Sequence, residues 1–295
     1  MYIFLNDRII DEEDALISVR DRGFLYGDGI FETLRSYDGH IFSLERHLAR
    51  MRSSAGELRI PFGYSDSDIG KTINELLKMN KLADSYIRIT LSRGCGGSGF
   101  QIPDSNGKRI NTPEENYTIV IQTRQLKEYD VVLYKRGMSL VVSKYRVSSS
   151  CPISRHKTAN FLSNIMIRED AVQKNGHDAL FLDTDGMVAE CTASNLFFVK
   201  DGAVITPPLD SSILPGITRQ TVIDICKENA ISVIEKQFPL EVLMEADECF
   251  ITNSIMEIMP VSMIDGIKIG NEIPGKQTRY LMEAYKDFVK RDMDV

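Results

Sequence analysis

The connections between strand-like segments constrain the fold of this chain more than any other feature. Residues 2–5 and 8–10 have the pattern of two strands joined by the turn formers Asn6-Asp7, which predicts a β-hairpin. Strand-like segments at 196–199 and 204–206 are also separated by only a short turn. Parallel strands need a crossover of about a dozen residues or more, so connections this short require antiparallel neighbours. Because helices and strands mix without strict β-α-β repetition, the sequence predicts an α+β fold rather than a doubly wound sheet.

The pattern divides the chain into two blocks. In the first block, apolar residues recur at helical spacing from Leu44 to Leu58, and a second helix is predicted after Ser65-Asp66. The apolar pattern lapses over 123–137, where we place an interdomain linker. We therefore expect a small N-terminal α+β domain over 1–122 and a larger C-terminal α+β domain over 138–295. Further strands are predicted at 86–92, 117–122, 140–142, 179–182, 232–234 and 248–251, and further helices at 160–175, 218–229 and 275–289.

Composition argues against several classes of partner. Lysine and arginine total 35 against 42 acidic residues, and no basic block recurs, so a nucleic-acid partner is not expected. The chain start lacks the regions of a signal peptide, and no apolar run approaches the ~20 residues of a spanning helix. A cytoplasmic location without a membrane partner is therefore expected. The 5 cysteines and 4 histidines show no ligand spacing, so neither disulfides nor a metal site is expected.

One stretch imitates a dinucleotide-binding motif. The pattern G-x-G-x-x-G is satisfied by residues 94–99, Gly-Cys-Gly-Gly-Ser-Gly, after a predicted strand. A dinucleotide-binding turn must run directly into a helix that holds the pyrophosphate, whereas turn formers and Pro103 follow here. We therefore interpret residues 93–116 as a long loop near a site entrance, because loops of this length are usually functional or mobile.

Four short stretches are specific only in combination. They are His47-Leu-Ala-Arg50, His156-Lys157-Thr-Ala-Asn160, Glu190-Cys-Thr-Ala-Ser-Asn195-Leu-Phe and Leu214-Pro-Gly-Ile-Thr218-Arg. In this order they resemble the class IV (fold type IV) aminotransferases, which depend on pyridoxal 5'-phosphate (PLP). That family includes branched-chain and D-amino acid aminotransferases and 4-amino-4-deoxychorismate lyase. The resemblance extends from residues 21–33 to 252–260, and it implies an enzyme with a two-domain D-amino acid aminotransferase-like fold and PLP as cofactor.

The resemblance assigns the cofactor chemistry to two residues. Lys157 is the expected Schiff-base lysine, and its amine must be neutral part of the time, which a desolvated or cation-adjacent site favours. Arg155 and His156 would provide such cations if they point inward. Glu190 is the expected carboxylate facing the pyridine nitrogen, which must stay protonated for the cofactor to act as an electron sink. Taken alone, either residue would be interpreted as a solvated surface residue.

The cofactor phosphate is a dianion, for which a helix N-terminus is a receptor. Residues 215–218, Pro-Gly-Ile-Thr, open a predicted helix, and Arg50 would add charge and a bidentate fork. An ordinary helix cap and a solvated arginine are the alternatives. Relatives place a hydroxyl on the same phosphate at the position of Ser254. The cofactor-binding residues implied by the resemblance are Arg50, Lys157, Glu190, Gly216, Ile217, Thr218, Asn253 and Ser254.

Substrate carboxylates need cationic partners, and Arg35, Arg88 and Arg93 are the candidates. Each could equally be a structural ion-pair partner. Phe161 stands where many relatives have tyrosine, so a hydrogen bond to the cofactor would be missing. The substrate-binding residues implied by the resemblance are Phe31, Thr33, Arg35, Arg88, Ile255 and Met256.

The reaction is predicted from the pocket loops. Branched-chain members usually carry Gly-Thr-Ala-Ala-Glu where residues 253–257 are Asn-Ser-Ile-Met-Glu, in a segment whose backbone amides meet the substrate carboxylate. The Arg-x-His trap of D-amino acid members is missing after Arg93-Gly94. Residues 252–260 and 30–35 are more similar to bacterial lyases. We therefore expect a 4-amino-4-deoxychorismate lyase of the folate pathway, with a branched-chain or related transaminase using 2-oxoglutarate as the alternative.

The resemblance also implies partners. Relatives place the cofactor between two domains and form dimers with shared pocket walls, so a small amino acid-like substrate and a homodimer are expected. A competing hypothesis is a non-catalytic homologue that only binds a small ligand. The presence of both Lys157 and Glu190 argues against it.

Overall fold

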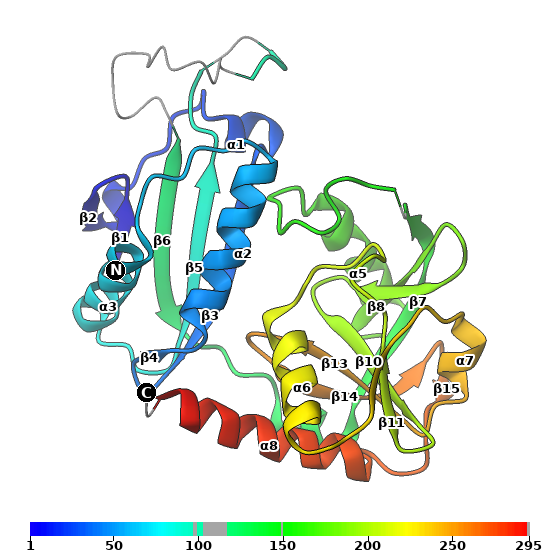
Figure 1. Cartoon of the computed structure of the whole chain (residues 1–295). Helices are drawn as coiled ribbons and strands as arrows, with labels where there is room; N and C mark the ends of the chain where they lie inside the picture. Colours follow the sequence, from blue (N-terminus) through cyan, green and yellow to red (C-terminus); the bar gives the residue numbers. More distant parts are fainter. Residues whose placement is uncertain (97–98, 103–116, 149, 294–295) are drawn as a thin grey trace. The chain divides into compact units, whose positions relative to one another are not determined.

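The computed structural model of the 295-residue chain describes residues 1–96, 99–102, 117–148 and 150–293 (Figure 1). The chain forms two compact units: unit 1 contains Met1–Lys127 and His156–Asn160, and unit 2 contains Glu128–Arg155 and Phe161–Val295. Part of the glycine-rich stretch 94–99 and most of the long loop 93–116 lie outside the described residues.

Unit 1 is built on a six-stranded sheet of order β2-β1-β6-β5-β3-β4, in which every pair is antiparallel. The predicted hairpin forms one edge, with Tyr2 opposite Asp11. The strands are β1 (Tyr2–Leu5), β2 (Arg8–Asp11), β3 (Gly29–Tyr37), β4 (His40–Ile41), β5 (Ser85–Ser92) and β6 (Thr118–Gln125). The helices are η1 (Glu12–Asp14), α1 (Arg22–Tyr26), α2 (Leu44–Glu57) and α3 (Asp66–Asn80).

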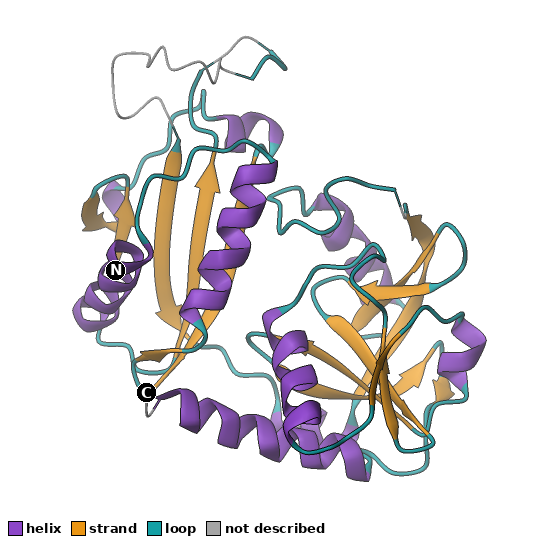
Figure 2. Cartoon of the chain, viewed as in Figure 1, coloured by secondary structure: helices purple, strands orange, loops and turns teal. Residues whose placement is uncertain are grey.

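One face of this sheet is covered by α2 and α3 (Figure 2). Both helices place an apolar stripe at helical spacing on it, including Leu48 and Met51 of α2 and Ile73 of α3. Leu34 of β3 and Ile87 of β5 complete the same core. Since side chains alternate along a strand, the odd-numbered residues of β3 lie on the opposite face of the sheet.

Unit 2 contains a nine-stranded mixed sheet in which β14-β7, β7-β8 and β11-β12 are parallel and the other pairs antiparallel. The mixture agrees with the predicted α+β class. Its strands are β7 (Met138–Val147), β8 (Asp178–Asp183), β9 (Val188–Cys191), β10 (Asn195–Lys200), β11 (Ala203–Thr206), β12 (Val233–Glu235), β13 (Glu248–Asn253), β14 (Glu257–Ile264) and β15 (Ile267–Lys268). Its helices are α4 (Val131–Arg136), α5 (Leu162–Gln173), α6 (Ile217–Glu228), α7 (Leu240–Met244) and α8 (Lys276–Met293).

The boundary between the units differs from the sequence expectation in two respects. It falls between Lys127 and Glu128, and the expected linker 123–137 contains the end of β6 and all of α4. The segment His156–Asn160 belongs to unit 1, whereas the sequence placed Lys157 in the C-terminal domain. The cause is backbone pairing with β3, because Phe31 N donates to Lys157 O at 2.8 Å and Ala159 N donates to Gly29 O at 2.8 Å. So short a segment has no periodicity from which this pairing could be predicted.

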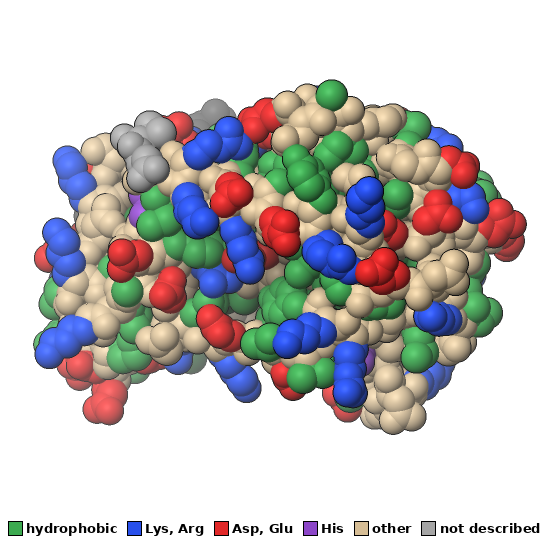
Figure 3. Space-filling model, turned by 90° about the horizontal axis from the view of Figure 1, so that it is seen from below, with side chains coloured by type: hydrophobic (Ala, Val, Ile, Leu, Met, Phe, Trp, Pro, Cys, Tyr) green, Lys and Arg blue, Asp and Glu red, His purple; other side chains and the backbone are tan. Residues whose placement is uncertain are grey.

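Charges of both signs are interspersed with apolar side chains on the face drawn in Figure 3. Within the described residues, no helix is both long and apolar enough to span a membrane. Nor do His, Cys, Asp and Glu residues of that part of the chain gather into a group of three or more that could hold a metal ion.

Candidate active site

Lys157 is fixed to the sheet of unit 1 through its backbone and lies with its Nζ 4.6 Å from the centroid of the Phe31 ring. The preceding His156 is buried, with Nδ1 3.0 Å from Ser54 Oγ and Nε2 3.6 Å from Glu57 Oε2 of α2. Arg155 is exposed. The cationic neighbourhood expected from Arg155 and His156 is therefore not what surrounds the amine, whose position follows from the pairing with β3.

A buried ionic cluster joins α2 to β3 in the same unit. Arg50 donates from Nε to Glu32 Oε1 at 2.8 Å and from Nη2 to Glu32 Oε2 at 2.6 Å, and His47 Nδ1 lies 2.7 Å from the same Oε2. His47 and Arg50 are three residues apart on the helix and share its face. Arg50 is thus not a solvated arginine, since a bidentate contact fixes the plane of its guanidinium.

The ionisation of this cluster follows from its charges. Burial alone would raise the pKa of Glu32, but the Arg50 charge and the hydrogen bonds from His47 and Arg50 lower that pKa to about 2. Burial lowers the pKa of His47, and this outweighs the attraction of Glu32. The charge of Lys157 lowers the His47 pKa further, so Lys157 lies within electrostatic reach of the cluster. Glu32 and His47 were not predicted as site residues.

The face of the unit 1 sheet opposite the core carries the predicted substrate-binding residues of β3 and β5. Thr33 is opposite Arg88, and Phe31 is opposite Thr90. The Arg88 guanidinium lies 3.7 Å from the Phe31 ring centroid, and its Nε donates to Thr90 Oγ1 at 3.1 Å. The Arg35 guanidinium lies 4.4 Å from the Tyr37 ring centroid. Two cations are therefore presented on one rigid surface.

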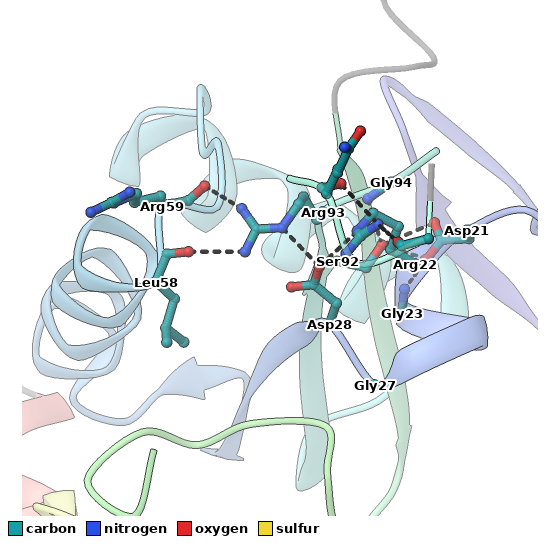
Figure 4. A network of polar contacts seen from close by, with 12 residues as sticks. Asp21, Arg22, Gly23, Gly27, Asp28, Leu58, Arg59, Ser92, Arg93 and Gly94 are labelled. Carbon is teal, nitrogen blue, oxygen red and sulfur yellow. Dashed lines mark hydrogen bonds and ion pairs between the residues drawn. The ribbon is translucent and has the colours of Figure 1, made fainter. Parts of the chain in front are cut away.

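Arg93 serves the fold in unit 1 (Figure 4). Its Nε donates to Asp28 Oδ2 at 2.8 Å, and its two terminal nitrogens donate to the carbonyls of Leu58 and Arg59. Arg22 donates to the same Asp28 oxygen at 2.8 Å and to Gly99 O at 2.9 Å. Burial opposes ionisation, yet both arginines lower the pKa of Asp28. Of the two roles left open for Arg93, the structure supports that of an ion-pair partner.

In unit 2, Glu190 lies at the end of β9 and is half-buried. Its Oε2 accepts hydrogen bonds from Asn195 Nδ2 at 2.9 Å and from Leu214 N at 3.0 Å. Both donors are neutral amides. They fix the orientation of the carboxylate without cancelling its charge.

The predicted phosphate receptor is the N-terminus of α6. Gly216 is its N-cap, with extended backbone (φ −65°, ψ 138°) and no side chain to accept a hydrogen bond from the first turn. Ile217 and Thr218 are the first two helical residues, and both are buried. A capping side chain would occupy these N–H groups, so its absence leaves the helix end suited to an anion.

The loop between β13 and β14 is organised by Asn253. Its Oδ1 accepts hydrogen bonds from Ile255 N and Met256 N, both at 2.9 Å, and its Nδ2 donates to Ala193 O at 3.1 Å. Met256 is buried, and its carbonyl accepts from the Tyr134 hydroxyl at 3.1 Å. Ser254 lies within this turn. The backbone amides that the sequence resemblance connects with a substrate carboxylate are thus occupied by an asparagine side chain.

Comparison with known proteins gives consistent relatives. The profile of the family described as "Amino-transferase class IV" matches residues 29–264. The chain is 38% identical to the "Putative branched-chain-amino-acid aminotransferase" of Methanocaldococcus jannaschii, over 97% of this chain and 96% of that protein. It is 32% identical to the "Aminodeoxychorismate lyase" of Bacillus subtilis, over 98% and 94%. It is 30% identical to the "D-alanine aminotransferase" of Bacillus licheniformis, over 98% and 97%.

Solved structures match the fold over nearly the whole chain. The branched-chain amino acid aminotransferase of Escherichia coli gives a TM-score of 0.89 at 29% identity, covering 98% of this chain and 94% of that one. The "Putative 4-amino-4-deoxychorismate lyase" of Legionella pneumophila gives 0.85 at 27%, covering 94% and 97%. A further branched-chain amino acid aminotransferase, solved with pyridoxamine 5'-phosphate and given the source abbreviation T.th., gives 0.88 at 29%, covering 98% and 93%. The fold expected from the sequence is confirmed.

Proposed function

Because this chain belongs to the class IV aminotransferases, we propose that it is a 4-amino-4-deoxychorismate lyase, which releases pyruvate and p-aminobenzoate in the folate pathway. Family membership makes the chain an enzyme and PLP its cofactor, as the sequence predicted. A branched-chain amino acid transaminase is the second candidate, and the 38% identity to the archaeal relative favours it.

The donor set of unit 2 fits PLP. A carboxylate held by neutral amides, Glu190, suits a protonated pyridine nitrogen, and the uncapped first turn of α6 suits a phosphate. In unit 1, Lys157 supplies the amine, and Arg50 supplies a guanidinium in a fixed plane. We assign phosphate binding to Arg50, to the first-turn amides of Gly216-Ile217-Thr218, to the Thr218 hydroxyl and to the Asn253-Ser254 loop.

When bound, PLP supplies an electron sink for the bonds around the substrate amine. We assign to Lys157 Nζ the covalent attachment of the cofactor and the movement of a proton to and from the substrate. Glu190 holds the proton at the ring nitrogen. The Phe31 ring, 4.6 Å from Lys157 Nζ, shields the amine from water on that side.

The observation that carries the choice of reaction is the occupation of the Ile255 and Met256 amides by Asn253 Oδ1. Glycine at this position, as in branched-chain members, would leave those amides to a substrate carboxylate. Here the carboxylates need other partners, and Arg35 and Arg88 share one sheet face with Phe31 and Thr33. Two cations on a rigid surface suit 4-amino-4-deoxychorismate, which carries two carboxylates. Ile255 and Met256 then contribute apolar surface.

The deciding experiment measures both reactions with purified protein. Pyruvate and p-aminobenzoate release from 4-amino-4-deoxychorismate is compared with glutamate formation from leucine and 2-oxoglutarate. We expect turnover in the first assay and loss of it in Lys157→Ala. Turnover of leucine with none of the aminochorismate would reject the lyase in favour of the second candidate. No PLP binding and no effect of Lys157→Ala would reject the enzyme altogether.

A variant pair tests the argument from the loop. Asn253→Gly removes the acceptor for both amides, and we expect the ratio of transaminase to lyase turnover to rise about 10-fold, the equivalent of one hydrogen bond. Asn253→Asp keeps an oxygen at the same place and is the matched control, with an expected ratio within about 3-fold of the parent. An equal change in both variants would contradict the role given to the Asn253 oxygen.

The proposed assembly is a homodimer. In unit 1, Leu16, Val19, Phe24 and Leu25 are apolar and more than half exposed, a clustering that usually marks an interaction surface. We expect a dimer by light scattering, weakened by Phe24→Asp and unchanged by Val131→Asp, which alters an exposed apolar residue of α4. A monomeric parent protein would reject this part. All 5 cysteines are free, which supports the cytoplasm as the proposed location.

A further inference from the structure

Asn195, the first residue of β10, occupies a junction in unit 2 to which no role has yet been assigned. Its side chain is buried, at 5% exposure. The Nδ2 group donates to Glu190 Oε2 and to Leu214 O, each at 2.9 Å, and Leu214 N donates to the same Glu190 oxygen at 3.0 Å. One amide therefore connects β9, which carries Glu190, to the segment that enters α6.

The other side of the same amide contacts the helix cap. A Cβ built on Gly216 would lie 1.9 Å from Asn195 Oδ1, far inside van der Waals contact, so only glycine permits the helix to begin this close to the amide. The N-cap determines where the first-turn N–H groups of Ile217 and Thr218 point. Asn195 thus contacts both the carboxylate and the residue that sets the direction of the helix end.

We propose that Asn195 is a positioning residue that fixes the spacing between Glu190 and the N-terminus of α6, so that the ring nitrogen and the phosphate of PLP are bound as one unit. The proposal rests on the cofactor roles given above to Glu190 and Thr218. The ring of PLP is rigid and sets how far apart its nitrogen and its phosphate substituent lie. A site whose two ends are aligned before binding loses less conformational entropy when the cofactor enters.

The chemistry of asparagine suits this role. Its NH₂ group has two hydrogens, enough for Glu190 and for the Leu214 carbonyl together. A cation here would neutralise the Glu190 carboxylate, and a carboxylate would repel it. A neutral amide holds Glu190 in place while its negative charge remains for the protonated ring nitrogen.

The test is a pair of double-mutant cycles on PLP affinity of the apoprotein, measured by absorbance titration. We expect Asn195→Ala to raise the PLP dissociation constant about 10- to 100-fold, as is common for residues that orient binding groups. In the Asn195→Ala background, the separate effects of Glu190→Gln and Thr218→Ala should each shrink by about 3-fold or more, because the ends are no longer aligned. Additive effects in both cycles would overturn the proposal.

A second probe separates positioning from local damage. Pyridoxal lacks the phosphate and inorganic phosphate lacks the ring, so each occupies one end only. We expect Asn195→Ala to weaken PLP by a larger factor than it weakens either fragment. Equal factors for PLP and pyridoxal would show that Asn195 acts on the ring end alone and would overturn the proposal.

The matched control is Asn229→Ala at the other end of α6. Asn229 Nδ2 donates to Ile225 O at 2.8 Å, and its Oδ1 accepts from the Tyr280 hydroxyl at 2.7 Å. We expect lower stability with an unchanged PLP dissociation constant. Should Asn195→Ala fail to fold, Asn195→Asp keeps the shape and loses the donor, and it should weaken PLP in the same two cycles.

The outcomes separate this inference from the proposed function. PLP binding with coupled cycles but without lyase turnover would reject the lyase and support the role of Asn195. Lyase turnover with additive cycles would do the reverse. A parent protein that does not bind PLP would reject both.

Discussion

Each unit holds a glutamate in a fixed orientation, but the partners differ in charge. Glu32 of unit 1 is 1% exposed and is bound by the Arg50 guanidinium and by His47. Glu190 of unit 2 is half-buried and is bound by the neutral amides of Asn195 and Leu214. The first carboxylate is neutralised inside the fold, whereas the donors on the second leave its charge in place. The comparison teaches that a carboxylate can serve to orient a cation or can be oriented to receive one.

The largest expected effect comes from removing the charge that unit 2 keeps. Glu190→Gln retains an oxygen for Asn195 and Leu214 but cannot hold the ring-nitrogen proton. We expect kcat to fall roughly 10²- to 10⁴-fold, the usual size of a proton-transfer contribution. The free energy of unfolding of the apoprotein should change by less than about 1 kcal/mol. Turnover within tenfold of the parent would show that the two glutamates do not differ in this way.

The corresponding change in unit 1 should act on stability. Glu32→Gln leaves the Arg50 guanidinium in a buried place without its counter-charge, and we expect the free energy of unfolding to fall by about 3–5 kcal/mol. Urea unfolding of the apoprotein measures it. Glu12→Gln is the control, because Glu12 pairs with Arg124 at the surface, where such a contact contributes about 1 kcal/mol or less. Equal losses in both variants would contradict the burial argument.

The acid range sharpens the comparison further. The pKa of Glu32 is about 2 in the folded protein against an ordinary value of 4.5. A lowered folded-state pKa contributes stability that is complete above the unfolded value and is lost as the pH falls toward 2. We therefore expect the stability gap between the parent and Glu32→Gln to be constant above pH 4.5 and to narrow by about 1 kcal/mol per pH unit below it. A gap that widens in acid would contradict the assignment.

The smallest effect concerns Phe161, the N-cap of α5 in unit 2. Phe161→Tyr adds the hydroxyl that many relatives have at this position. We expect PLP affinity to rise by less than about 10-fold, the value of one hydrogen bond. The absorbance spectrum of the bound cofactor should shift with it. A variant with unchanged affinity and spectrum would show that Phe161 does not face the cofactor.

The regular elements could be predicted from the sequence because their signals are local. The stripe through Leu48 and Met51 predicted α2 to within a residue, and the continuous apolar run near 117–122 predicted β6. The α+β class followed from the short connections. The polar partners could not be predicted in this way, because Glu32, His47 and Asn195 acquire their roles only when separate elements pack together. A charged residue inside an otherwise buried strand was the one available signal for Glu32.

The candidate site was predicted by motif and corrected by geometry. The sequence identified Arg50 as a bidentate group, and the structure adds that Glu32 holds the guanidinium. It gave Arg93 equal chances of two roles, and the contacts with Asp28 decide for the ion pair. The domain of Lys157 was beyond prediction, since the pairing of residues 157–159 with β3 involves a partner more than a hundred positions away in the chain.

That pairing has a consequence for synthesis of the protein. The chain passes from unit 1 to unit 2 after Lys127, returns at His156 and leaves again after Asn160. A ribosome that has released only the first 127 residues has therefore not yet delivered the strip that completes unit 1. Until Asn160 emerges, the Phe31 amide and the Gly29 carbonyl lack their backbone partners. Unit 1 is thus finished only after part of unit 2 has been made, and a single cut in the chain cannot yield two complete units.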